Sequence, residues 1–244
     1  MINIDLLVIA PDGLFDQRGE PYVAETPYGA ARMLPDRIGA QAGAWVAASA
    51  SPFAAIYAAK AAGATRVVEL VPVVAINRLL EPGDLLLPDD LADRTGYQRY
   101  TFFAGKGYGF LSQREPFCPV LRGALLAAAR ALTPRSFARG VYLAVEGPPP
   151  TAAPPAWEAD IAGRGVVPTS FLARELEICY APLCVVAAQD DGRSFEQMRG
   201  LLDDTLADAL PRLPGERTCV CATAMQAYRD RGDIGPDWRT WIAV

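Results

Sequence analysis

Segments rich in β-branched and apolar residues alternate along this chain with segments rich in alanine and leucine. Strands and helices that alternate in this way predict an α/β protein, whose sheet is covered by helices. Runs that are apolar at nearly every position are typical of parallel strands buried on both faces. The predicted strands are residues 2–10, 44–50, 65–76, 138–147 and 180–189, with a short strand within 81–88.

Helices are expected between and after these strands. Ser51 is suited to an N-cap and Pro52 to the first turn of a helix that reaches about residue 62. Ser194 and Gln197 have the spacing of a capping box at the start of the clearest amphipathic helix, 194–213. Further helices are predicted over 119–132 and 168–178, whereas 89–117 is predicted to be irregular. We therefore expect a mixed or mostly parallel sheet with helices on both faces.

Such sheets bind ligands at the carboxyl ends of their strands. The loops to inspect follow Ala10, Ala50, Val74, Glu146 and Ala188.

The composition narrows the classes of function. The chain has 244 residues, 51% of them hydrophobic, which fits a single domain over 1–244 with a core that needs no disulfide or metal. Its net charge of −5 argues against a nucleic-acid partner, because phosphate backbones require a basic surface. The longest apolar stretch, 43–59, is mostly alanine and is interrupted by Pro52, so no membrane span is predicted. With Asp5 and no basic cluster at the start, we expect a cytoplasmic protein.

Histidine is absent, which excludes Ser-His and Cys-His nucleophiles and removes the commonest metal ligand. Three of the five cysteines, Cys118, Cys179 and Cys184, lie in apolar segments and are interpreted as small core residues. Cys219 and Cys221 form a C-x-C. Without histidine or a second close cysteine pair, this pattern predicts neither a zinc site nor any other metal or cofactor.

Five motifs occur in a fixed order: "EPGDLLLPDDLADRTGYQRYTFF", "EPFCPVLRGALLAAA", "VEGP", "VVPTSFLARELEICYAPLCVVAA" and "ERTCVCATAM". Together they resemble the purine nucleoside phosphorylase superfamily, in particular its 5′-methylthioadenosine phosphorylase branch. The resemblance extends from about Ile2 to Met225. It implies a three-layer domain with a mixed central sheet, usually a homotrimer, that cleaves the N-glycosidic bond of purine nucleosides with phosphate.

Phosphorolysis needs a cradle for phosphate, a clamp for ribose and a group that stabilises the departing purine. At the position of the family's Gly-rich phosphate turn this chain has Pro11-Asp12-Gly13, and Asp12 would repel phosphate at close range. The family's Arg-His-Gly segment is missing, with Ser49 and Ser51 the only hydroxyls there. Its Thr-Ala-Cys-Gly-Ser turn has become residues 71–75, "VPVVA".

The remaining family positions have also changed. Gly165 aligns with a phosphate-binding threonine, and Arg164 with a methionine that contacts ribose. The purine-side Asp-x-Asp aligns with Ala188-Gln189-Asp190, so one carboxylate remains. The base-stacking loop after "VEGP" is about five residues shorter, with five prolines within 148–155. Pro150 holds the place of the stacking aromatic and Thr151 that of the polar residue beside it.

Three interpretations remain open. The chain could be a working phosphorylase, which the fold resemblance favours and the changed phosphate positions disfavour. It could carry out altered N-glycosidic chemistry, with Asp190 acting on the leaving base and Asp12, Gly13, Arg164, Thr151 and Gln189 contacting a nucleoside-like ligand. It could also be a catalytically silent homologue that binds a ligand or serves as an assembly or regulatory subunit.

Overall fold

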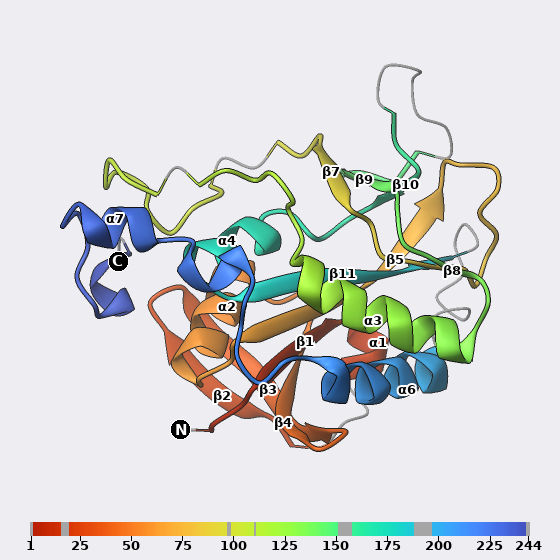
Figure 1. Ribbon diagram of the computed structural model, residues 1–244, viewed down its shortest axis with the longest axis horizontal. Coiled ribbons are helices and arrows are strands. Elements are labelled where there is room, and N and C mark those ends of the chain that lie inside the picture. Colours follow the sequence, from red (N-terminus) through yellow and green to blue (C-terminus); the bar gives the residue numbers. More distant parts are fainter. Residues whose placement is uncertain are drawn as a thin grey trace.

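The computed structural model describes residues 2–15, 20–96, 99–109, 111–150, 158–187 and 197–242 (Figure 1). Within these ranges a mixed sheet lies between two layers of helices, as the strand–helix alternation predicts. The strands are β1 Leu6–Ala10, β2 Tyr22–Thr26, β3 Gly29–Ile38, β4 Gln41–Ala47, β5 Arg66–Ala75, β6 Leu85–Leu86, β7 Asp90–Asp93, β8 Ser136–Phe137, β9 Val141–Ala144, β10 Ile161–Gly163 and β11 Cys179–Val186.

The helices lie on both faces of the sheet. The α-helices are α1 Asp12–Phe15, α2 Pro52–Ala61, α3 Pro119–Leu132, α4 Thr169–Glu175, α6 Arg199–Ala209 and α7 Gln226–Asp230. Short 3₁₀ turns follow in the C-terminal part: η2 Leu210–Arg212, η3 Val220–Thr223 and η4 Trp238–Thr240. The Ser51 hydroxyl accepts a hydrogen bond from the Ala54 amide at the start of α2, which confirms the predicted N-cap.

The centre of the sheet is parallel. β1 pairs in parallel with β4 and β5, and β11 pairs in parallel with the other side of β5. Beyond this centre the hairpin β2–β3 adds antiparallel strands next to β4, and β10 pairs antiparallel with the end of β5. Parallel pairing places the carboxyl ends of β4, β1 and β5 along the same edge.

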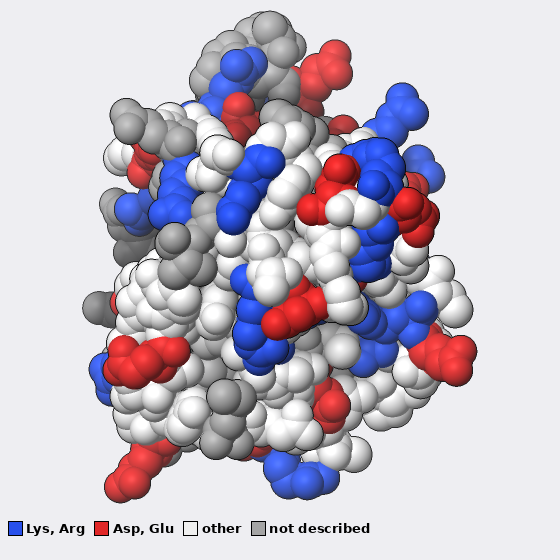
Figure 2. All heavy atoms as spheres, turned by 90° about the vertical axis from the view of Figure 1, so that its left-hand side faces the viewer, with Lys and Arg blue, Asp and Glu red and all other residues white. Residues whose placement is uncertain are grey.

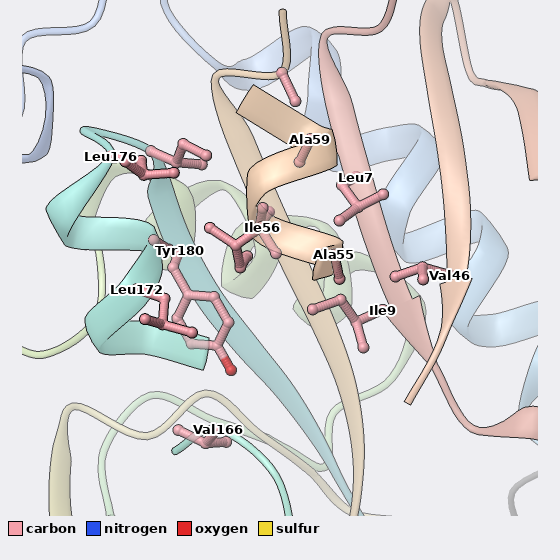
Figure 3. Close-up of a cluster of buried hydrophobic side chains, with 14 of the residues drawn as sticks. Leu7, Ile9, Val46, Ala55, Ile56, Ala59, Val166, Leu172, Leu176 and Tyr180 are labelled. Carbon is pink, nitrogen blue, oxygen red and sulfur yellow. The ribbon is translucent and has the colours of Figure 1, made fainter. Parts of the chain in front are cut away.

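Alternation along β1 explains the three layers. Leu7 and Ile9 pack into a core with α2 and α4, whereas Leu6 and Val8 pack on the opposite face with α3 and α6. Successive side chains of a strand point to opposite faces, so a strand buried throughout needs helices on both. Figure 3 shows the first of these cores, in which Ile56 of α2 and Leu172 of α4 approach the sheet from one side.

The hairpin β2–β3 and the short strands β8 and β10 were not predicted. In β3 apolar and polar positions do not alternate cleanly, and Pro35 lies inside the strand. Such a pattern gives little strand signal because proline removes a ladder donor. The irregular region 89–117 holds one short strand, β7, in its described part.

Candidate functional site

The loops that follow β1 and β4 meet at the carboxyl edge of the sheet. The Ala48 amide donates to the Ala10 carbonyl at 2.7 Å, which joins the two strand ends. Just beyond, the Ser49 amide donates to the Asp12 Oδ1 at 3.3 Å. The first predicted ligand residue thus binds a backbone N–H of the neighbouring loop. Anion-binding cradles are made of such free N–H groups, and here a carboxylate of the chain itself occupies one.

Gly13 follows Asp12 in the one-turn helix α1 and is exposed. Its carbonyl oxygen lies 3.4 Å from the Arg199 guanidinium at the start of α6, and the Leu14 carbonyl lies at the same distance. These contacts connect the loop after β1 to the helix layer on the α3/α6 face.

A second carboxylate lies beneath the loop that precedes α4. Glu69 is level with Ile9 near the end of β1 and is only 4% exposed. The Val166 amide donates to its Oε1 at 3.1 Å, and the Tyr180 hydroxyl donates to its Oε2 at 2.6 Å. Burial raises the pKa of Glu69, and the two hydrogen bonds oppose that rise. Figure 3 shows the Tyr180 hydroxyl pointing toward the loop that carries Val166.

Glu69 determines which residue can stand at position 165. A Cβ added to Gly165 would lie 2.5 Å from the Glu69 Oε1, and Gly165 has a φ of +102°. A side chain at this position would therefore clash with the carboxyl group and strain the backbone. The threonine that the resemblance implies at position 165 cannot be accommodated while Glu69 is present. Arg164, the preceding residue, is exposed just after β10.

A third buried carboxyl group, Glu175, ends α4. The Phe102 amide donates to its Oε2 at 2.7 Å. Burial raises the pKa of Glu175 to about 7. Phe102 packs against Tyr28 with ring centroids 5.1 Å apart, and the Arg99 guanidinium lies over the Tyr28 ring at 5.2 Å. The carboxyl group of Glu175 is thus hydrogen-bonded to the backbone of an aromatic cluster, and a guanidinium group lies over one ring of that cluster.

The turn Asp93-Arg94-Thr95 is held together by hydrogen bonds within the turn and to a neighbouring strand. The Thr95 amide and hydroxyl both donate to the Asp93 Oδ1, at 2.8 and 2.7 Å. The Arg94 amide donates to the Ala144 carbonyl at the end of β9.

The predicted site residues Thr151, Gln189 and Asp190 lie outside the described residues, as do Ser194 of the capping box and part of the proline-rich loop. Asp12, Gly13 and Arg164 are described, and none of their described contacts joins Arg164 to the other two. The sequence reasoning missed Glu69 and Glu175. A signal for Glu69 was available, because a lone carboxylate inside the apolar run "TRVVELVPVV" must find donors when it is buried.

Basic and acidic side chains are interspersed on the face that carries α7 (Figure 2). Here Arg229 pairs with Glu177 at 2.7 Å and Arg231 with Asp233 at 2.9 Å. Among the described residues, no helix has both the length and the apolar character that crossing a bilayer requires.

Comparison with known proteins gave one family and a consistent set of relatives. The phosphorylase superfamily model matches residues 36–212. The S-methyl-5′-thioadenosine phosphorylase of Thermofilum pendens is 33% identical over 186 residues, 70% of this chain and 71% of that protein. The probable 6-oxopurine nucleoside phosphorylase of Dictyoglomus turgidum is 27% identical over 263 aligned residues, 93% of this chain and 98% of its own length.

Solved structures show the same fold. A methylthioadenosine phosphorylase from an antarctic soil metagenomic library superposes with a TM-score of 0.83 at 21% identity, covering 99% of this chain and 98% of that one. The methylthioadenosine phosphorylase of Schistosoma mansoni, solved in complex with adenine, gives a TM-score of 0.76 at 20% identity, covering 93% and 96%. The predicted three-layer fold with a mixed sheet is confirmed.

Proposed function

This chain belongs to the phosphorylase superfamily, and from that premise we propose that it binds a nucleoside-like small molecule without catalysing ordinary phosphorolysis. Relatives that it resembles are named as methylthioadenosine and 6-oxopurine nucleoside phosphorylases, and one of them was solved with adenine. The purine nucleoside class of ligand follows from that similarity.

One observation supports the proposed absence of ordinary phosphorolysis. Two backbone N–H groups donate to carboxylates of the chain: Ser49, in the segment where the resemblance implies Arg-His-Gly, donates to Asp12, and Val166, directly after the position of the phosphate-binding threonine, donates to Glu69. A phosphate bound there would have to displace a carboxylate and remain close to its charge, which is unfavourable at short range. Loss of a single oxyanion donor typically slows a reaction by about 10²–10³-fold, and here several are replaced.

The roles of individual residues are part of the proposal. Arg164 is exposed at the place that ribose contacts imply, so it can offer a guanidinium to a charged substituent of the ligand. We assign hydrogen bonding of the base to Gln189 and Asp190 and of the sugar to Thr151. The resemblance also leads us to propose a homotrimer. Light scattering of the purified protein measures the molar mass of the oligomer. No disulfide joins the described cysteines, which is consistent with the reducing cytoplasm that we propose as the location of the protein.

The test is a base-release assay with 5′-methylthioadenosine, adenosine and inosine, each with and without phosphate. We expect no phosphate-dependent release of base from any of the three. In parallel, the nucleosides and their free bases are screened for stabilisation of the fold, which reaches about 2.7 kcal/mol at a ligand concentration of 100 Kd. Release that phosphate accelerates contradicts the loss of phosphorolysis. Release that is equal in both conditions indicates hydrolysis, and no stabilisation by any of these compounds contradicts the ligand class.

A further inference from the structure

Four cysteines from three distant segments meet near the amino end of β11, at the end of the sheet opposite to the loops after β1 and β4. Cys118 precedes α3, Cys179 is the first residue of β11, and Cys219 and Cys221 lie at the start of η3. Their four sulfur atoms all lie within 4.8 Å of one another. Cys179 Sγ and Cys219 Sγ are 3.3 Å apart.

This spacing matches the donors of one small metal ion. In a tetrahedral site with Zn–S bonds of about 2.3 Å, neighbouring sulfur atoms are about 3.8 Å apart. The observed separation of 3.3 Å and the upper limit of 4.8 Å for all pairs bracket that value. Cys118, Cys179 and Cys221 are buried and Cys219 is partly buried, so the thiols are shielded from competing water. Four sulfur donors in this arrangement select zinc or iron over harder ions.

The surroundings hold the C-terminal donors in place. The Arg217 guanidinium donates to the Glu177 carbonyl at 2.6 Å, and Arg66 donates to the Pro214 carbonyl at 3.1 Å. Arg229 makes a two-pronged ion pair with the Glu177 carboxylate, at 2.7 and 3.0 Å. These bonds fix the segment that carries Cys219 and Cys221 against the start of β11.

The charged groups around the four cysteines also favour thiolates. Arg66 and Arg217 line a small pocket together with Cys118, Cys179 and Cys219. The amino end of the 14-residue helix α3 begins directly after Cys118. Both the guanidinium groups and the helix terminus favour negative charge, so they compensate a cluster of thiolates.

We propose that Cys118, Cys179, Cys219 and Cys221 bind one Zn²⁺ ion as a structural tetrathiolate site. In forming it, four S–H bonds break, four Zn–S bonds form, and four protons pass to solvent, leaving a complex of charge −2 with no change of oxidation state. All four positions of the metal are filled by protein, so the ion has no open site for a substrate. Its effect is to connect the C-terminal segment to the sheet and to α3.

The experiment uses the full chain, purified without chelator and under reducing conditions. We expect about one zinc per chain by elemental analysis. Exchange of zinc for Co²⁺ should give the intense visible bands and thiolate-to-metal charge transfer of tetrahedral sulfur coordination. The spectrum is recorded on the unchanged protein, so this readout does not depend on whether a variant folds.

Two variants form a matched pair. Cys219→Ala removes the least buried donor, and its affinity for Co²⁺ should fall by more than about 100-fold, beyond the 10–100-fold typical of losing a residue that merely supports a ligand. Cys184→Ala changes a cysteine of the same strand as Cys179 that is buried outside the cluster. It should leave metal content and spectrum unchanged.

Three results would overturn the proposal. One is a chain that stays metal-free after Zn²⁺ is supplied to the reduced protein. Another is a cobalt spectrum without sulfur charge transfer. The third is a set of disulfides among these four cysteines in the freshly purified protein, shown by the mass of peptides before and after reduction.

Discussion

The two ends of the parallel strands differ in how their polar groups are bonded. At the carboxyl end, where a fold of this kind binds its ligand, Asp12 and Glu69 accept hydrogen bonds from the amides of Ser49 and Val166. At the amino end, where β5 and β11 begin side by side, four thiols gather within 4.8 Å of one another. Two amides near the expected ligand-binding edge are thus bonded to carboxylates of the chain, whereas the other end gathers four sulfur atoms whose chemistry suits a metal ion.

This contrast shows how a scaffold and its site can separate. The fold matches that of a solved methylthioadenosine phosphorylase with a TM-score of 0.83, whereas the sequence resemblance predicts that residues at the strand ends have changed. Function depends on groups placed on a fold and can be lost or replaced while the core is kept. The substitutions that follow alter the carboxylates, their partners and a control position, and they measure what each contact contributes to stability or to phosphate binding.

The largest effect is expected at Gly165. Replacing it with alanine places a Cβ 2.5 Å from the Glu69 carboxyl oxygen on a backbone with a φ of +102°. Strain and overpacking together should lower the free energy of unfolding by about 4 kcal/mol. Urea unfolding measures it.

Gly83 is the matched control, because its φ is +94° but a Cβ there meets nothing within 4 Å. Gly83→Ala should cost only the backbone strain, about 1–2 kcal/mol. Adding Glu69→Ala to Gly165→Ala should recover part of the loss. Equal losses at the two glycines would show that Glu69 does not occupy the space beside position 165.

Glu175 should make the stability of the protein depend on pH. Its folded pKa of about 7 lies above the ordinary value of 4.5 because the group is buried. The folded state therefore holds a proton that the unfolded state releases, and stability is lost as pH rises from about 4.5 to 7. The difference of about 2.5 pKa units corresponds to about 3 kcal/mol. Glu175→Gln, which keeps an acceptor for Phe102, should remove this part of the pH dependence.

Unfolding by urea at pH 5 and pH 8 checks this prediction in the parent chain and in Glu175→Gln. The parent should lose more stability than the variant between the two values. Identical losses would contradict a raised pKa at Glu175.

A moderate effect is expected from Tyr180→Phe. The variant removes the hydroxyl that donates to Glu69 at 2.6 Å and leaves a buried carboxyl group with one donor fewer. This should cost about 2 kcal/mol. A double-mutant cycle with Glu69→Gln isolates the pair, and a coupling energy near zero would show that the two side chains act independently.

Asp12→Ala should have the smallest effect on stability, within about 0.5 kcal/mol, because Asp12 is exposed. It frees the Ser49 amide, so any weak affinity for phosphate should increase. A thermal shift in phosphate, compared with the same ionic strength of chloride, measures the change. A shift equal to that of the parent would show that Asp12 does not block this amide.

The fold was predictable because it rests on local patterns that agree with the tertiary structure. The apolar runs at β1, β5 and β11, the capped helix α2 and the helix α3 all form within a few residues of the predicted ranges. The hairpin β2–β3 was missed because Pro35 and the weak alternation of β3 hide a strand that its neighbour β4 stabilises.

The sites were less predictable because their members are far apart in the chain. Cys118 and Cys219 are separated by about a hundred residues, so no spacing rule joins them, and the C-x-C was judged against patterns with a second close pair. Likewise Glu69 reaches Val166 only because β10 runs back along β5. The sequence predicted that the phosphate donors have changed, but it did not indicate that Asp12 and Glu69 would accept hydrogen bonds from the amides of Ser49 and Val166.

The most direct test of the proposed loss of the phosphate site is the binding of inorganic phosphate itself. Isothermal titration of the parent chain, repeated with a nucleoside present, measures it without relying on turnover. The account predicts no saturable binding up to millimolar phosphate under either condition. Saturable binding of one phosphate per chain would contradict it, all the more if Ser49→Pro, which removes the backbone N–H, abolishes the binding and a distant change such as Gly83→Ala does not.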